Sequence, residues 1–390
     1  MKNEWHTKQL GDLCEVIAGQ SPEGKFYNAE GRGMPFYQGK KDFGEKFIEA
    51  PTTWTTHMTK AAKEGDILMS VRAPVGPVNF ATDEVCIGRG LAAIRSGAEL
   101  NRDFLFYQLW YLQPEIAGRE GAVFASINKA EIAALPLAFV PLPEQQRIVG
   151  ILDEAFDGIA KARTNAEKNL QNARALFESH LQSVFTQRGE GWVETTLSQA
   201  TGGILTGPFG SLLHKSDYVA NGIPLVNPAH ITEVGIEPDF RKTVSTETAL
   251  HLKSYIMREG DIVIGRRGEM GRCALVTAVE DGWLCGTGSF FIRPSSQCDT
   301  RYLVRFLRSE GCKERLEKIA GGAVMPNLSN TDLGNLHIDL PPIDRQKAII
   351  EEIDILHEET QRLESLYQRK LAVLDELKKS LLHQAFSGLL

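Results

Sequence analysis

The pattern of apolar and polar positions divides the chain into four segments. Residues 1–141 and 189–342 contain short apolar runs interrupted by Gly and Pro, whereas 142–188 and 343–390 carry apolar residues at steps of three and four. The first pattern is typical of a mixed domain, and the second predicts a long helix with a narrow apolar seam. We call 1–141 the first head and 189–342 the second head. The pattern thus predicts two heads, each followed by a long helix.

Each long helix has a seam that must be covered. In the first helix the predicted seam residues are Ile148, Leu152, Ala155, Ile159, Ala162, Ala166, Leu170, Ala173, Phe177, Leu181 and Val184. In the second they are Ile353, Leu356, Leu363, Leu366, Leu371, Leu374, Leu377 and Leu381, and Asp344 is the predicted N-cap. At 1.5 Å per residue, such helices extend on the order of 65 Å. Each could pack only on its own head, but antiparallel pairing is favoured, because a closed duplication tends to contact itself isologously.

Inside the heads, two kinds of element are expected. Residues 65–70 and 260–265 both begin Gly-Asp-Ile and predict a turn followed by a strand. Residues 102–112 and 300–310 predict short amphipathic helices.

These similarities belong to an internal repeat that runs the length of the chain. Matched positions include Trp5 and Trp192, Gly65-Asp66-Ile67 and Gly260-Asp261-Ile262, Gln145 and Gln346, Asp153 and Asp354, and Phe185 and Phe386. The offset only grows, from 187 to 201, as expected if the second copy carries a few loop insertions. We therefore predict a duplicated head-plus-helix unit.

Composition adds bounds to this organisation. The chain has 390 residues, enough for two or three domains, and its 42% hydrophobic and 24% charged content is that of a globular protein. No apolar run reaches the roughly 20 residues that span a bilayer, and the start lacks a signal-peptide core. The six cysteines show neither CxxC spacing nor a disulfide framework, which predicts buried, inert thiols in a reducing cytoplasm.

The net charge of −7 does not favour a protein that binds DNA without partners. Local Lys and Arg can still contact phosphates, and Arg, Asn, Gln, Ser and Thr can read base edges. Such side chains stand on Gly- and Pro-rich loops at predicted strand ends, where scaffolds commonly hold contact residues. The DNA-contact candidates of the first head are Gln20, Ser21, Lys25, Tyr37, Gln38, Lys40, Lys41, Arg72 and Arg89. Those of the second head are Thr206, Ser211, Lys215, Asn227, His230, Arg241, Lys242, Arg266, Arg267 and Arg272.

Motifs for catalysis are weak throughout. Leu340-Pro341-Pro342-Ile343 has the prolines of a methyltransferase loop but apolar neighbours, so it favours the start of a helix. The Gly-rich pieces 31–33 and 286–288 are too short for nucleotide loops. The nine histidines are dispersed without metal-ligand spacing. We expect a reader module with no catalytic residue and no metal.

The ordered set of motifs resembles the specificity subunits of type I restriction–modification systems. The resemblance rests on the duplicated layout, on 142–149 (LPEQQRIV) preceded by 127–132 (INKAEI), and on the more diverged 341–349 (PPIDRQKAI). It implies an α+β fold: two globular α/β target recognition domains joined by two long helices in an antiparallel coiled coil, with pseudo-two-fold repeat. Each head would read one half of a split, asymmetric DNA site.

The same resemblance implies partners. Two methyltransferase (modification) subunits would dock on the helical regions, and restriction subunits that translocate DNA would join them. S-adenosylmethionine, ATP and Mg would belong to those partners, with no cofactor in this chain. The residues expected to bind partners, at the two junctions, are Glu144, Gln145, Arg147, Arg345 and Gln346. The second junction has Asp344-Arg345 where the first has Pro143-Glu144.

Two alternatives stay open from sequence. One is the specificity subunit of a related system in which modification and cleavage share one partner chain. The other is a coiled-coil scaffold whose heads bind proteins, although the polar loops of the two heads differ more than such a scaffold requires.

Overall fold

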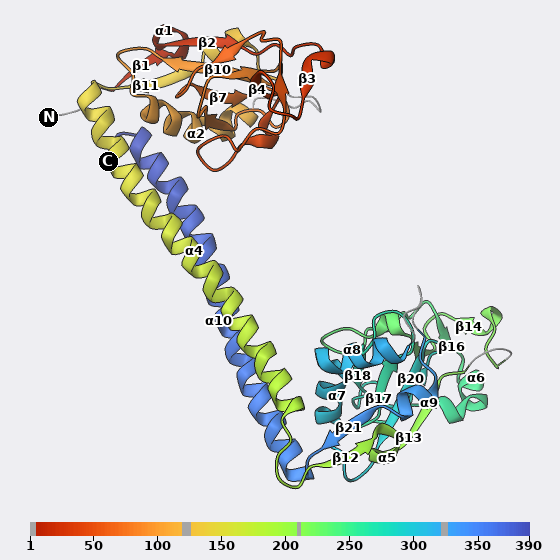
Figure 1. Cartoon of the computed structure of the whole chain (residues 1–390). Coiled ribbons are helices and arrows are strands. Elements are labelled where there is room, and N and C mark those ends of the chain that lie inside the picture. Colours follow the sequence, from red (N-terminus) through yellow and green to blue (C-terminus); the bar gives the residue numbers. More distant parts are fainter. Residues whose placement is uncertain (1–4, 119–125, 209–211, 321–326) are drawn as a thin grey trace. The chain divides into compact units, whose positions relative to one another are not determined.

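The computed structural model describes residues 5–118, 126–208, 212–320 and 327–390. It divides into two compact units, residues 1–168 with 367–390 (unit 1) and 169–366 (unit 2). Each unit contains one head and one section of each long helix (Figure 1).

The first head is a β-rich domain with helices packed on it. Its strands are β1 His6–Gln9, β2 Cys14–Ala18, β3 Tyr27–Asn28, β4 Met34–Tyr37, β5 Trp54–Thr55, β6 Ala61–Ala62, β7 Ile67–Ser70, β8 Val78–Phe80, β9 Val85–Ile87, β10 Leu91–Ser96 and β11 Pro136–Phe139. Its helices are α1 Leu10–Leu13, α2 Arg102–Gly118 and α3 Lys129–Ala133. The strands form sheets of order β2-β10-β7-β8 and β3-β5-β4-β9-β6, and a separate pair β1-β11.

The second head repeats this order. Its strands are β12 Val193–Thr196, β13 Thr201–Thr206, β14 Tyr218–Val219, β15 Ile223–Val226, β16 Thr243–Val244, β17 Ile262–Gly265, β18 Cys273–Leu275, β19 Leu284–Cys285, β20 Ser289–Pro294 and β21 His337–Leu340. Its helices are α5 Leu197–Ala200, α6 Thr246–His251, α7 Thr300–Arg308, α8 Glu310–Ile319 and α9 Asn330–Gly334. The sheets β13-β20-β17-β18, β14-β16-β15-β19 and β12-β21 correspond to those of the first head. The repeat is therefore confirmed, and α6 lies where the sequence offset grows.

The Gly-Asp-Ile segments show why the repeat is retained. Gly65 and Gly260 turn the chain with φ of 82° and 89°, a conformation that favours glycine. The following Asp66 and Asp261 are 3% and 2% exposed, and each accepts a backbone N–H from three residues earlier. Arg95 and Arg293, on the neighbouring strands, donate two hydrogen bonds to these carboxylates. The turn-then-strand prediction is confirmed, and a salt bridge between a buried carboxylate and a partly buried arginine stabilises each turn.

The helix predictions are right in kind and wrong in detail. The helix expected over 102–112 extends as α2 to Gly118, and the one expected over 300–310 ends at Arg308, after which Ser309 starts α8. Asp344 is not an N-cap, because α10 already begins at Ile343 and places Asp344 in its first turn. Its carboxylate there still faces the positive end of the helix dipole.

The long helices α4 Leu142–Thr186 and α10 Ile343–Phe386 pair in an antiparallel fashion within each unit. In unit 1, Arg163 forms an ion pair with Asp375 and Phe156 lies 5.4 Å from the Nζ of Lys378. In unit 2, Arg174 pairs with Glu364 at 2.7 Å, and the Phe177 and His357 rings are 5.2 Å apart. The predicted coiled coil is confirmed.

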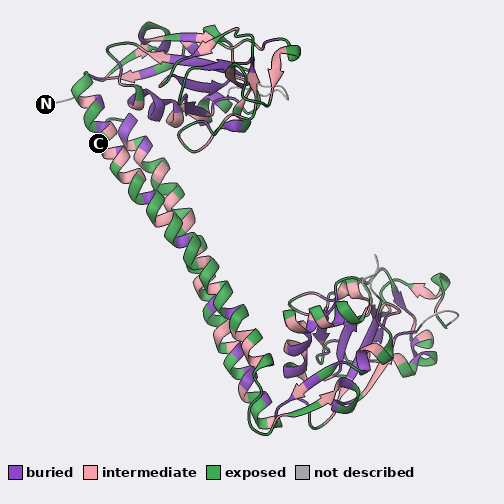
Figure 2. Cartoon of the chain, viewed as in Figure 1, coloured by how far each residue is buried: buried purple, intermediate pink, exposed green. Residues whose placement is uncertain are grey.

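The predicted seam holds for α4, but two of its α10 residues are wrong. Leu366 and Leu377 are 49% and 43% exposed, whereas the polar Thr360 is buried. Figure 2 shows buried positions continuous in each head and intermittent along the helices. Each core is completed by the first turns of one long helix and the last turns of the other: Ile148 and Leu152 meet Phe386, and Ile350 meets Phe185. No helix within the described residues is long and apolar enough to cross a membrane.

Candidate DNA interface

Each head has a cleft at the same place in its fold. The first cleft, about 570 Å³, lies at the ends of β2 and β7, beside the β9–β10 turn and the start of α3. The second, about 590 Å³, lies at the ends of β13 and β17, beside the β19–β20 turn and the start of α9. The candidates that line the second cleft are Thr206, Asn227, Arg266 and Arg267. Arg72 and Arg89 line the first and also an adjoining hollow of about 230 Å³ that contains Gln38 and Lys40.

Main-chain hydrogen bonds give the residue correspondence between the two clefts. The N–H of Val71 donates to Gly90 O at 3.0 Å, as that of Arg266 donates to Gly288 O at 3.0 Å. The N–H of Ile127 donates to Val71 O, as that of Leu328 donates to Arg266 O. Corresponding pairs are therefore Ala18 and Thr206, Gln38 and Asn227, Val71 and Arg266, Arg72 and Arg267, Arg89 and Thr287, and Lys129 and Asn330. One backbone frame carries two different sets of side chains.

Among the described residues, both clefts carry positive charge, and none of the side chains that line them there is acidic. Within the described parts of the chain, no carboxylate forms an ion pair with Arg72, Arg89, Arg266 or Arg267. An electropositive concave surface of this kind attracts a polyanion, even on a chain whose net charge is negative.

The arginine pair of the second cleft is held in place before any ligand arrives. The Nε atoms of Arg266 and Arg267 both donate to Asn327 Oδ1, each at 3.2 Å. The guanidinium of Arg266 also stacks over the Phe290 ring, 5.4 Å from its centroid. Burial, and secondarily the nearby charge of Arg267, lower the pKa of Arg266 from its ordinary value. Two guanidinium groups brought together in this way favour an anionic or strongly hydrogen-bond-accepting ligand.

Several predicted DNA contacts lie outside the clefts and are already engaged. Lys25 pairs with Glu23 at 2.6 Å, Lys41 with Asp42 at 3.8 Å, Arg241 with Asp239 at 2.9 Å, and Arg272 with Glu269. The basic side chain of each pair is exposed, and ion pairs with an exposed partner are weak, so these cations stay available to a stronger partner. Gln20, Lys215 and Lys242 are exposed, and Ser21 accepts a hydrogen bond from the N–H of Arg89. Ser211 lies outside the described residues.

Two candidates form hydrogen bonds within their own head. Tyr37 is 2% exposed, and its hydroxyl donates to Glu49 O at 2.8 Å, so it presents no group to DNA. His230 turns back on its own loop, where Nδ1 lies 2.9 Å from Leu225 O and 3.3 Å from the N–H of Asn227. Tyr37 is the last residue of β4 and His230 lies in the turn after β15, and the sequence pattern did not distinguish these positions from exposed loops.

The junction residues predicted to bind partners divide in the same way. Gln145 and Gln346 are fully buried, and each amide joins the strand preceding its long helix to the loop before α2 or α7. Gln145 donates to Glu99 O and Val140 O and accepts from Asn101 N; Gln346 donates to Gln297 O and Pro341 O and accepts from Asp299 N. Neither side chain is available to a partner, which corrects the expectation.

The charged junction residues remain at the surface. Arg147 donates two hydrogen bonds to Glu144, at 2.7 and 2.8 Å, and one to Leu390 O. Arg345 pairs with Glu352 at 2.9 Å.

Sequence reasoning missed part of the cleft lining. Asn128 and Lys129 line the first cleft, and Thr287, Ser329 and Asn330 line the second. The signal was present, since 127–129 and 328–330 are matched segments of the repeat with unlike side chains. Asn128 and Ser329 also cap α3 and α9, so these two positions serve folding as well.

Groups suited to chemistry are scarce in the described residues. They contain no cluster of three His, Cys, Asp or Glu side chains that could hold a metal ion. All six cysteines are free, as predicted. Burial raises the pKa of Cys14, Cys298 and Cys312 to about 12, which keeps these thiols protonated and unreactive.

Comparison with known proteins identifies the family to which the chain is similar. Residues 2–169 and 211–371 match the family model for the type I restriction modification DNA specificity domain. A putative type I restriction enzyme MjaX specificity subunit from Methanocaldococcus jannaschii is 39% identical over 175 residues, 44% of this chain and 41% of that protein's length. The MjaVIII specificity subunit of the same organism is 21% identical over 99% of this chain and 92% of its own.

Solved structures show the same fold along the whole chain. The HsdS subunit from Thermoanaerobacter tengcongensis is similar with a TM-score of 0.67 at 19% identity, covering 99% of this chain and 97% of that one. A chain from a structure of a type I restriction–modification system, described for its complex assembly and conformational transition, has a TM-score of 0.76 at 19% identity, covering 99% and 98%. With a family model matched twice, once in each half, the chain belongs to the type I restriction–modification specificity subunits.

Proposed function

We propose that this chain reads a bipartite, asymmetric DNA site for a type I restriction–modification complex. The observation that carries the proposal is the pair of corresponding clefts, which share one backbone frame and differ in nearly all lining side chains. Two readers of different half-sites need such an arrangement, because the frame positions the DNA and the side chains distinguish its bases. We assign reading to 1–141 and 189–342, and spacing of the half-sites to 142–188 and 343–390.

The chain itself acts without catalysis in this proposal. Methylation and cleavage belong to two modification subunits and to restriction subunits in the cytoplasm, which bring S-adenosylmethionine, ATP and Mg. The ion pairs Glu144–Arg147, in which only the arginine is exposed, and Arg345–Glu352 lie at corresponding starts of α4 and α10 and are our candidates for the docking surfaces. Their different arrangement means that the two docking contacts need not be identical.

Methylome mapping tests the proposal directly. Genomic adenine methylation is compared in cells with the gene, without it, and with it restored on a plasmid. We expect a split methylated motif that disappears on deletion and returns on complementation. An unchanged set of methylated motifs after deletion would contradict the proposal.

A binding measurement tests the division of labour. Because net charge is −7 and the clefts supply few cations, we expect the purified chain alone to bind the mapped duplex weakly. Adding the modification subunit should give specific binding. Tight, specific binding by the isolated chain would contradict the idea that the partners supply most of the phosphate contacts.

A further inference from the structure

One side chain is identical between the two clefts, and its neighbour is not. Arg72 and Arg267 occupy corresponding positions directly after β7 and β17. Each also forms a bridge to the segment before α3 or α9, at Ser126 and Asn327. The preceding residue is Val71 in the first head and Arg266 in the second. All other matched side chains named above for the clefts differ between the heads.

At a DNA interface, side chains that are the same in both heads and side chains that differ between them suit different contacts. The phosphate backbone is the same for every sequence, so a contact to it can be the same in both heads. Base edges differ between half-sites, so a side chain that reads them has reason to differ. The repeat within this one chain therefore sorts two adjacent arginines into different roles.

Resting on the proposed function, we infer that Arg72 and Arg267 bind backbone phosphates, and that Arg266 reads a guanine in the half-site of the second head. The exposed Arg267 and Arg72 suit a phosphate, which is approached from outside the base stack. Arg266 is half-buried, stacked on Phe290 and oriented through Nε by Asn327, which leaves its terminal amino groups for a ligand. A planar fork fixed in this manner matches the O6 and N7 acceptors of guanine in the major groove.

The test uses the complex of the full chain with the modification subunits, purified through a tag on this chain. Random-sequence duplexes are selected by each complex, and affinities for the wild-type consensus are then measured at several salt concentrations. The variants are Arg266→Val, which places the first head's residue on the shared frame, Arg266→Lys, Arg267→Ala and Arg72→Ala. Arg301→Ala, which alters an exposed arginine of the second head outside its cleft, is the matched control.

For Arg266→Val we expect the consensus to relax at one G·C pair of one half-site, with affinity for the original duplex about 5- to 150-fold lower. Arg266→Lys should keep the charge and lose part of this preference. Arg267→Ala and Arg72→Ala should leave the consensus unchanged, weaken binding to all sequences, and lower the slope of log K against log salt by about one.

Other outcomes overturn the assignment. A consensus unchanged by Arg266→Val, or altered at a base pair by Arg72→Ala or Arg267→Ala, would contradict the two roles. These results differ from failure of the proposed function itself, in which the wild-type complex would select no sequence.

Discussion

Trp110 in the first head and Arg308 in the second occupy corresponding positions on α2 and α7. The indole makes aromatic contacts with its neighbours, whereas the guanidinium makes hydrogen bonds. Trp110 contacts Phe106, Tyr107 and Phe156, and the Nζ of Lys378 on α10 lies 4.2 Å above its ring. Arg308 instead donates hydrogen bonds to the carbonyl oxygens of Thr232, Glu233 and Cys273. The first contact is an aromatic cluster between head and helix, and the second is a set of hydrogen bonds to the main chain within the head.

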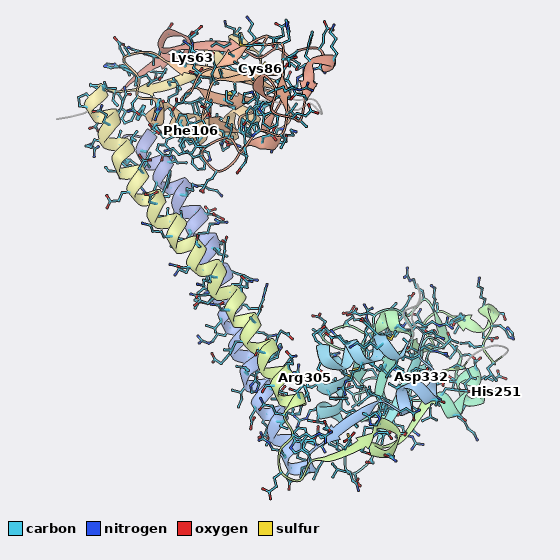
Figure 3. All side chains as sticks on the ribbon, in the orientation of Figure 1. Lys63, Cys86, Phe106, His251, Arg305 and Asp332 are labelled. Atoms are coloured by element: carbon cyan, nitrogen blue, oxygen red, sulfur yellow. The ribbon has the colours of Figure 1, made fainter. Side chains whose placement is uncertain are left out.

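The carboxylates that the helices offer to these sites are alike. Asp153 of α4 accepts from the Tyr107 hydroxyl and from Lys46 Nζ. Asp354 of α10 accepts a hydrogen bond from Arg305 of α7 at 2.9 Å. Figure 3 labels Arg305 on the second head. A cleft of about 650 Å³, lined by 232–237, α7 and α10, remains open in unit 2. Duplication has thus kept the polar positions that fix the backbone, while the contacts between each head and its helix have diverged.

Removing the shared buried carboxylate should give the largest effect, of similar size in both heads. Asp66→Ala and Asp261→Ala each remove the acceptor of a buried turn N–H and the main acceptor of a partly buried arginine, while Arg95 keeps Glu15 and Arg293 keeps Ile256 O. Breaking a fully buried pair costs about 3–5 kcal/mol, and we expect the lower end of that range here because the arginines are partly exposed. Urea unfolding followed by hydrogen exchange of peptides from each head separates the two values. Glu15→Ala, at the exposed partner of Arg95, is the control and should change stability by less than about 1 kcal/mol.

Unequal losses for these two variants would show that the heads are less alike than their sheets indicate. An effect below about 1 kcal/mol in both would mean that the arginines and the turn are satisfied by water.

Trp110→Ala should weaken the first head's contact with the helices and have no counterpart in unit 2. Loss of a half-buried indole from an aromatic cluster should destabilise unit 1 by about 2–3 kcal/mol, at the lower end of core values. Trp110→Phe keeps an aromatic ring and should recover most of this. Hydrogen exchange is expected to rise in α2 and in the adjoining turns of α4 and α10. A rise of the same size in 300–308 would contradict the independence of the two contacts.

The repeat and both long helices could be predicted from sequence because periodicity and spacing survive wherever backbone geometry demands them. The α10 seam was partly wrong for a specific reason. The seam follows a 3.5-residue repeat that passes through two polar residues, Thr360 and Lys378. The Thr360 hydroxyl donates to Leu356 O, and the Lys378 side chain packs on the Trp110 and Phe156 rings. Selecting leucines alone therefore included Leu366 and Leu377, which lie on the outer face.

The candidate sites show the same limit. Arg72, Arg89, Arg266 and Arg267 were identified from residue type and loop position, and the structure gathers them into clefts. Tyr37 is indistinguishable from them by those criteria, and only its packing reveals that its hydroxyl faces inward. Gln145 and Gln346 stand out in the sequence because they recur at matched positions of the repeat. They recur because both amides bond backbone groups, and repetition alone does not separate that role from partner binding.

Arg308→Ala should loosen the second head locally, with a smaller effect than Trp110→Ala. Its guanidinium satisfies three carbonyl oxygens, two of which can turn to solvent when it is removed, so we expect a loss of about 2 kcal/mol. The change should appear as faster exchange in 230–237. Arg308→Lys, which keeps the charge but not the fork, should give an intermediate result. Unchanged exchange in that segment would show that the loop is held by the sheet alone.

The smallest expected effect comes from exchanging a residue between corresponding loops. Lys46 and Val234 hold equivalent places, and Lys46 lies 3.3 Å from Asp103 and 3.2 Å from Asp153. Lys46→Val removes a partly buried cation from two carboxylates and should destabilise unit 1 by about 1 kcal/mol, less at high salt. The converse change, Val234→Lys, should give little gain, because Arg305 already pairs with Asp354, and Arg301 and Arg308 line the same cleft as its other carboxylates Glu233, Glu237 and Glu280. Stabilisation of unit 2 by Val234→Lys, measured by urea unfolding, would show that this open cleft lacks positive charge and that the two contacts are closer in chemistry than their residues indicate.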